Sequence, residues 1–286
     1  MKTAVIGANG QLGTDLCRVF RECGHEIVEL DHKSLEVADF RNCEKTLGKI
    51  KPDVVLNAAA MHHVELCEKE PAKAFAVNAL GPRNLALLSA LMGFKLVHFS
   101  TDYVFDGAKS APYTESDLPL PLNVYGTSKL AGEIFVRRTT PHHFVARISA
   151  IYGEAPCRAK GGLNFVRLML KLARERKEIR VVADEVVSPT YARDVATQVE
   201  RLTRTEAFGL YHMTSQGSCS WYEFALKIFE LAGVSISVVR AQPEEFPHKV
   251  NRPKYSVLDN VNLRAIGMDV MPTWEKALED FFLLPF

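Results

Sequence analysis

Residues 3–13 read Thr-Ala-Val-Ile-Gly-Ala-Asn-Gly-Gln-Leu-Gly, and this stretch governs how the rest of the chain is interpreted. Residues 3–6 form a short apolar strand pattern, and Leu12, Leu16 and Phe20 then recur at helical spacing. The glycines at 7, 10 and 13 permit a tight turn and let backbone N–H groups approach a pyrophosphate at the helix N-terminus. Because the triplet lies between a strand and a helix, it predicts a dinucleotide-binding turn and not merely a connection.

Strand and helix patterns alternate beyond this turn. Strand patterns at 26–30, 53–57, 95–100 and 144–148 are separated by helix patterns at 42–50, 71–92 and 124–138. This rhythm predicts βαβ units and a doubly wound, Rossmann-type parallel α/β sheet. We expect residues 1–150 to form an NAD(P)-binding domain. Residues 151–286, with helix patterns at 191–203, 221–231 and 274–282, are expected to form a smaller α/β substrate lobe, with some segments returning to the first domain.

Composition excludes several classes of protein. The 286 residues are 47% hydrophobic and 24% charged, with a net charge of +1, so no large basic field is available to attract nucleic acid or an anionic membrane. The six cysteines show no C-x-x-C pair and predict neither a disulfide framework nor a metal site. The N-terminal residues lead directly into a strand pattern without a signal-peptide region, which predicts a cytoplasmic protein.

The end of the second strand pattern bears on the cofactor. Asp31 stands where a carboxylate accepts hydrogen bonds from the ribose hydroxyls of adenosine, which favours NADH. His32 and Lys33 follow at once and could instead pair with a 2′-phosphate, so the sequence leaves NADH and NADPH open. The pair 39–40 either flanks the adenine or caps the next helix.

A second group of residues carries acid–base chemistry. Tyr125 and Lys129 are four residues apart in a helix pattern, which places both on one face, one turn apart. We expect the lysine ammonium to lower the pKa of the phenol so that Tyr125 can give or take a proton. Ser100 and Thr101 end the fourth strand pattern, at the sheet edge where ligands of such folds bind. A hydroxyl there can hold a substrate carbonyl oxygen while Tyr125 protonates it.

These motifs occur together in the order that one enzyme superfamily uses. The chain resembles the extended short-chain dehydrogenase/reductases and, within them, the family of dTDP-4-dehydrorhamnose reductases. The stretches that carry the resemblance span most of the chain: Gly-Ala-Asn-Gly-Gln-Leu-Gly at 7–13, Asn-Ala-Ala-Ala at 57–60, Ser-Thr-Asp-Tyr-Val-Phe-Asp-Gly at 100–107, Leu-Asn-Val-Tyr-Gly-Thr-Ser-Lys-Leu-Ala-Gly-Glu at 122–133, Ser-Pro-Thr at 188–190 and Arg-Pro-Lys-Tyr-Ser at 252–256.

The resemblance implies a specific reaction and specific contacts. It implies reduction of the C4 ketone of dTDP-4-dehydro-L-rhamnose to dTDP-L-rhamnose by NADPH or NADH. Tyr125 would be the general acid, Lys129 would hold the nicotinamide ribose and polarise Tyr125, and Thr101 and Asp102 would hold the sugar. The implied cofactor contacts are Gly7, Gly10, Gln11, Leu12 and Gly13 at the pyrophosphate turn, Asp31, Asp39 and Phe40 at the adenosine, and Ala58, Ala60, Met61, His62, Phe99, Ser100, Tyr125 and Lys129 along the remainder.

The sequence also departs from the family pattern. Ala150 stands where the family usually carries a tryptophan that packs on the substrate sugar, so a reductase of another NDP-4-keto-6-deoxysugar remains an alternative. A second alternative, from a different class, is a non-catalytic NADP-binding regulatory subunit like that of methionine adenosyltransferase. The resemblance is compatible with a homodimer and with Mg²⁺ at a dimer contact, but no residue pattern locates a metal site. Arg158, Arg252 and Lys254 are the cations expected near the nucleotide diphosphate.

Overall fold

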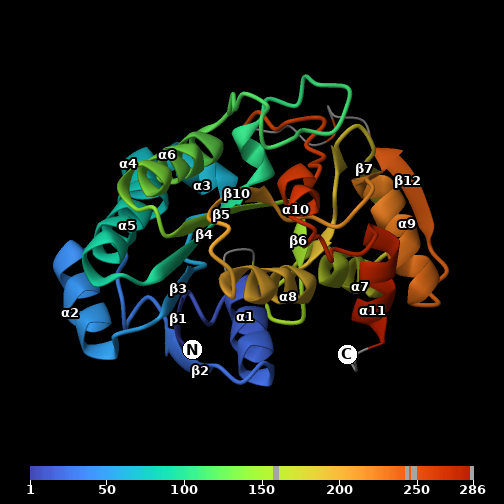
Figure 1. Cartoon of the computed structure of the whole chain (residues 1–286). Coiled ribbons are helices and arrows are strands. Elements are labelled where there is room, and N and C mark those ends of the chain that lie inside the picture. Colours follow the sequence, from blue (N-terminus) through green and yellow to red (C-terminus); the bar gives the residue numbers. More distant parts are fainter. Residues whose placement is uncertain (157–160, 242–244, 246–249, 284–286) are drawn as a thin grey trace.

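The computed structural model describes residues 1–156, 161–241, 245 and 250–283. Its centre is a six-stranded, fully parallel sheet with the strand order β10-β5-β4-β3-β1-β2 (Figure 1). The strands are β1 (Lys2–Ile6), β2 (Glu26–Leu30), β3 (Val54–Asn57), β4 (Lys95–Thr101), β5 (His143–Ile148) and β10 (Gly209–His212). The predicted doubly wound α/β fold is confirmed. The sequence-based boundary near residue 150 stays a prediction, and β10 joins the sheet from beyond it.

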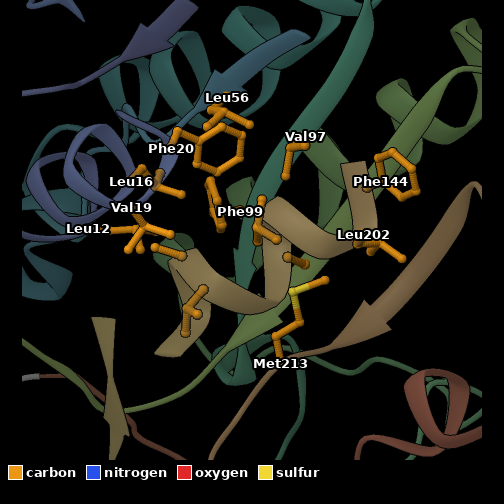
Figure 2. Packing of buried hydrophobic residues seen from close by; sticks show 14 of the residues in the cluster. Leu12, Leu16, Val19, Phe20, Leu56, Val97, Phe99, Phe144, Leu202 and Met213 are labelled. Atoms are coloured by element: carbon orange, nitrogen blue, oxygen red, sulfur yellow. The ribbon is translucent and has the colours of Figure 1, made fainter. Parts of the chain in front are cut away.

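Helices cover both faces of this sheet. On one face, α1 (Gln11–Glu22) and α8 (Ala192–Thr203) pack together over β1, β3, β4 and β5. Figure 2 shows this packing, with Leu16 and Phe20 of α1 meeting Leu56 of β3 and with Leu202 of α8 lying near Phe144. On the other face, a second apolar cluster joins the sheet to α2 (Phe40–Ile50), α5 (Gly81–Met92) and α6 (Val124–Thr139).

The strand order places a crevice at the centre of the sheet. The chain moves from β1 outward to β2 and then crosses to β3 on the opposite side of β1. The connections after β1 and β3 therefore diverge onto opposite faces, which leaves an opening beyond the carboxyl ends of the two strands. Both the glycine turn and the alanines at 58–60 lie at this edge.

One predicted helix is not regular. The pattern at 71–92 becomes α4 (Pro71–Phe75), a π-helical turn η1 (Ala76–Leu80) and α5. Pro82 explains the widened turn, because it has no N–H for the carbonyl of Asn78 and its ring would clash with that carbonyl in a regular helix. The sequence reading also missed the short helix α3 (Val64–Lys69), which begins after a cap formed by the His63 side chain.

The later part of the chain builds a further apolar cluster around three helices, α7 (Phe165–Glu175), α9 (Trp221–Leu231) and α11 (Trp274–Phe282). The described residues here also form three two-stranded sheets: β7 (Glu178–Val182) with β12 (Ser237–Ala241), β6 (Ile151–Tyr152) with β9 (Thr190–Tyr191), and β8 (Val186–Val187) with β11 (Cys219–Ser220). The 3₁₀ turn η2 (Asp102–Val104) follows β4, and the helix α10 (Val261–Ala265) packs against β10. Within the described residues, every helix is too short or too polar to cross a membrane.

Candidate active site

A cavity of about 640 Å³ opens beyond the carboxyl ends of β1, β3, β4 and β5. Most of the residues predicted for the site line this cavity, although they come from four separate parts of the chain. The predicted residues along its wall are Gly7, Gly10, Gln11, Leu12, Gly13, Ala58, Ala60, Met61, His62, Phe99, Ser100, Thr101, Asp102, Tyr125 and Lys129.

The glycine turn has the geometry of a phosphate cradle. Gly7 has a φ of +78°, and a Cβ at this position would lie 2.9 Å from the backbone nitrogen of Ala59, so the turn abuts the end of β3. A Cβ on Gly13 would lie 2.1 Å from the Gly7 carbonyl oxygen. Gly10 precedes α1 without a side-chain cap, and the first turn of the helix holds no acidic residue. The N-terminal N–H groups of α1 are therefore available to an anion, which fits a dinucleotide pyrophosphate.

The three residues predicted to contact adenosine, Asp31, Asp39 and Phe40, do not line the cavity. The carboxylate of Asp31 accepts hydrogen bonds from the backbone nitrogen and hydroxyl of Ser34 at 2.9 and 2.6 Å and from Lys33 N at 3.1 Å. Asp39 caps α2 by accepting from Asn42 N at 3.0 Å. Phe40 packs against the apolar cluster under α2. In the described structure these residues lie outside the cavity wall, which is formed there by His32, Leu35, Glu36 and Val37, so their contact with adenosine stays a prediction.

Tyr125 and Lys129 occupy one face of α6, which begins after Asn123 caps it by accepting from Gly126 N at 2.9 Å. The buried Nζ of Lys129 donates to the carbonyl oxygen of Phe99 at 2.5 Å. Burial lowers the pKa of Lys129 to about 8, and the charge of Glu133 acts in the opposite direction. The ammonium is thus fixed at the end of β4, beside Ser100 and Thr101.

The pKa of Tyr125 differs from the sequence-based expectation. Burial raises the pKa of the phenol above its ordinary value, and a hydrogen bond with Thr101 acts in the lowering direction. The expected lowering by Lys129 is not found, because the ammonium is directed at the Phe99 carbonyl. The phenol therefore holds its proton at neutral pH, which suits a proton donor.

Asp102 is buried, and its carboxylate accepts hydrogen bonds from three hydroxyl groups. Oδ1 accepts from Thr101 Oγ1 at 2.9 Å, and Oδ2 accepts from Ser149 Oγ at 2.9 Å and from Ser256 Oγ at 2.6 Å. Burial raises the pKa of this carboxyl, against the lowering effect of the three hydroxyls. Asp102 joins the ends of β4 and β5 to the segment that contains Ser256, so it organises the wall next to Thr101. Its predicted contact with a sugar stays a prediction.

The predicted cations lie away from the cavity wall as far as the structure describes it. Arg252 donates to Glu65 at 2.6 Å, and Lys254 lies 3.7 Å from Asp184. Arg158 is outside the described residues. Their neighbours Pro253 and Ser256 do line the cavity.

Sequence reasoning missed the far end of the cavity. Phe165 and Trp221 begin α7 and α9, and their ring centroids lie 4.6 Å apart in the cavity wall. The indole nitrogen of Trp221 donates to Glu185 at 3.2 Å. A capping residue, Asn164 or Ser220, precedes each aromatic residue, and this pattern could have marked the two positions as helix starts. Ala150 also lines the cavity, in a left-handed conformation with a φ of +43°.

The described residues offer no set of side chains that fits a metal ion. Within residues 1–156, 161–241, 245 and 250–283, no group of three or more His, Cys, Asp or Glu side chains could hold one. His63 caps α3 and lies 3.3 Å from Glu65.

The fold and the site together define a dinucleotide-binding α/β protein with the Tyr–Lys pair of the extended short-chain dehydrogenase/reductases. The chain belongs to the family described as RmlD substrate binding domain, whose match covers residues 1–283.

Individual relatives match over nearly the whole chain. The chain is 41% identical to the spore coat polysaccharide biosynthesis protein SpsK of Bacillus subtilis, over 98% of this chain and 96% of the relative. It is 37% identical to a dTDP-4-dehydrorhamnose reductase of Burkholderia thailandensis, over 97% of each chain. The crystal structure of dTDP-4-dehydrorhamnose reductase from Bacillus anthracis in complex with NADP superposes with a TM-score of 0.94, at 41% identity over 99% of each chain.

Proposed function

We propose that the chain is an NAD(P)H-dependent reductase that converts the C4 ketone of dTDP-4-dehydro-L-rhamnose to the hydroxyl of dTDP-L-rhamnose. The observation that carries the proposal is that the glycine turn, Thr101, Tyr125 and Lys129 line one cavity. The relative from Burkholderia thailandensis carries this activity in its name, and the related structure from Bacillus anthracis holds NADP. These similarities support the same reaction for this chain.

The residues have distinct roles in the proposed reaction. The glycine turn would hold the pyrophosphate of a reduced nicotinamide dinucleotide, which would supply the hydride for C4. Tyr125 is protonated at neutral pH and donates its proton to the oxygen that was the C4 carbonyl, while the hydroxyl of Thr101 orients that oxygen. Lys129, which donates to the Phe99 carbonyl at the end of β4, would hold the nicotinamide ribose beside Tyr125.

Replacement of the proton donor tests this assignment. Tyr125→Phe keeps the ring and removes the hydroxyl, so we expect kcat to fall by about 10²–10⁴-fold while NADPH affinity is retained. Tyr103→Phe is the matched control, because Tyr103 lines the same cavity with its ring centroid 5.7 Å from that of Tyr125. A decrease of less than about tenfold for Tyr125→Phe would remove Tyr125 from this role.

A second candidate keeps the chemistry and changes the sugar. Ala150 leaves space in the cavity wall where the family usually carries a tryptophan, and this favours a bulkier or differently substituted NDP-4-keto-6-deoxysugar. A comparison of kcat/KM for several 4-keto-sugar nucleotides, in the wild type and in Ala150→Trp, separates the two substrates. A shift of preference toward dTDP-4-dehydrorhamnose in Ala150→Trp supports the second candidate.

The regulatory-subunit alternative predicts NADPH binding without turnover of any 4-keto-sugar, together with copurification of a partner enzyme. The cytoplasmic location and the homodimer expected from the sequence stay predictions.

A further inference from the structure

A completely buried ion pair lies directly behind the proposed active site. Glu133 of α6 is 0% exposed and Arg147 of β5 is 1% exposed. Arg147 donates from Nε to Glu133 Oε1 at 2.9 Å and from Nη2 to Oε2 at 2.7 Å. Its remaining nitrogen lies 3.4 Å from His212 Nε2, and the guanidinium lies 5.1 Å from the ring centroid of Phe105. The pair is bidentate and held on several sides, which gives it a fixed geometry.

The Glu133 carboxylate also contacts β4, the strand whose carboxyl end lines the cavity. The hydroxyl of Ser100 donates to Glu133 Oε1. Ser100 lines the cavity between Phe99, whose carbonyl accepts from Lys129, and Thr101, which contacts Tyr125. Glu133 therefore fixes the end of β4 against α6 at the residues that position both proposed reactive groups.

Helical spacing places Glu133 close to those groups. Tyr125, Lys129 and Glu133 follow one another at intervals of four residues, so they share one face of α6. Other titratable groups lie around them. The pKa of His98 in β4 is lowered well below its ordinary value by burial and, to a smaller extent, by the charge of Lys129. The charges of Asp102 and Cys67 raise the pKa of Tyr125. The positive charge of Arg147 is paired with the carboxylate of Glu133. Burial lowers the pKa of Lys129 and so disfavours its charged form, whereas the negative charge of Glu133 raises this pKa.

Packing alone does not account for this pair. Two buried charges cost desolvation energy, and apolar side chains of similar volume fill such a space with equal or greater stability. A charged pair one helical turn beyond Lys129 is therefore explained better by an effect on Lys129 than by the stability of the core.

We propose that Glu133 is a positioning residue of this site, which keeps Lys129 charged and, through Ser100, holds the Phe99 carbonyl to which Lys129 is directed. This proposal rests on the function proposed above, because it assumes that charged Lys129 binds the nicotinamide ribose.

The test follows the pH dependence of cofactor binding and of turnover. The dissociation constant of NADPH, measured by its fluorescence between pH 6 and pH 10, should rise in the wild type as Lys129 loses its proton near pH 8. In Glu133→Gln we expect this transition, and the matching alkaline limb of kcat/KM, to move to lower pH by about one unit or more.

Two further variants separate this effect from loss of structure. Glu133→Leu combined with Arg147→Met removes both charges and keeps the volume, so it leaves no unpaired buried charge, and we expect it to show the same shift. Glu200→Gln is the matched control, because Glu200 is 4% exposed, pairs with His25 at 2.9 Å and lies in α8 away from the cavity wall. We expect its transition to stay at the wild-type pH.

Each outcome is decisive. A folded double variant with the wild-type transition and wild-type NADPH affinity would overturn the role of Glu133 and leave the proposed function intact. A wild type that binds neither NADPH nor NADH would overturn the proposed function, and the role of Glu133 with it. A shift in the double variant, with Glu200→Gln unchanged, supports the proposal.

Discussion

The Nζ atom of Lys129 lies 2.5 Å from the carbonyl oxygen of Phe99, so the ammonium is held by the end of β4. This contact puts a nearly dehydrated positive charge beside the cavity: Lys129 is 2% exposed and burial lowers its pKa to about 8. A group to which we assign a function therefore occupies a position that is unfavourable for folding.

Lys129→Met should separate function from stability. We expect turnover to fall by at least about 10²-fold, because the nicotinamide ribose loses the ammonium proposed to hold it beside Tyr125. We also expect the free energy of unfolding at pH 7 to rise by about 1–3 kcal/mol, because one unit of pKa shift corresponds to about 1.4 kcal/mol and the desolvated charge is gone. Urea denaturation and a turnover assay on the same preparations measure both effects. A variant that is less stable than the wild type would show that the charge is well compensated in the fold.

The pH dependence of stability should reveal the buried carboxyl of Asp15. This side chain is 1% exposed, and both of its oxygens lack a hydrogen-bond partner in the described structure. Burial, reinforced by Glu154, raises its pKa to about 6. Because the unfolded chain releases this proton near pH 4 and the folded chain retains it to about pH 6, stability should fall as the pH rises through that window.

Asp15→Asn tests this dependence. We expect the variant to be more stable than the wild type by about 1–3 kcal/mol at pH 8 and nearly equal to it at pH 4. Asp31→Asn is the control, because Asp31 is only partly buried and is hydrogen-bonded within its own turn, and its pKa is lowered. Equal urea midpoints for wild type and Asp15→Asn at both pH values would contradict the assignment.

The glycine turn should tolerate no side chain at position 13. In Gly13→Ala the new methyl group would lie 2.1 Å from the Gly7 carbonyl oxygen, so the turn must shift, and we expect NADPH affinity to fall by at least tenfold. Gly48→Ala is the matched helical control: its methyl group would lie 3.8 Å from Met92 Cε, and it should gain up to about 1 kcal/mol in helix propensity. NADPH titration and thermal melts of both variants check this, and unaltered NADPH binding in Gly13→Ala would disprove the close approach.

Local signals explain which parts of the molecule the sequence could predict. The glycine turn, the cap at Asp39 and the Tyr–Lys spacing on α6 each depend on residues within one turn of each other, so their patterns are visible in the chain. Asp31 accepts a hydrogen bond from Ser34 three residues later, which is a typical local partner in an aspartate turn and is visible in the sequence, while its contact with adenosine stays a prediction.

Other features depend on contacts between distant segments. The two-residue strands β6 and β9 pair residues near 151 with residues near 190, and no local pattern predicts such a pairing. The same holds for the aromatic residues Phe165 and Trp221, which meet in the cavity wall from separate helices. The buried partner of Glu133 is Arg147 of β5, which only the folded sheet brings next to α6.

The most direct test of the account is turnover of the proposed substrate by the full-length chain. Purified protein is mixed with NADPH and dTDP-4-dehydrorhamnose, oxidation of the cofactor is followed by absorbance, and the sugar nucleotide product is identified by mass spectrometry and NMR. We predict rapid oxidation with dTDP-L-rhamnose as the product, and loss of this reaction in Tyr125→Phe. Bound NADPH that is not oxidised in the presence of this substrate would contradict the account.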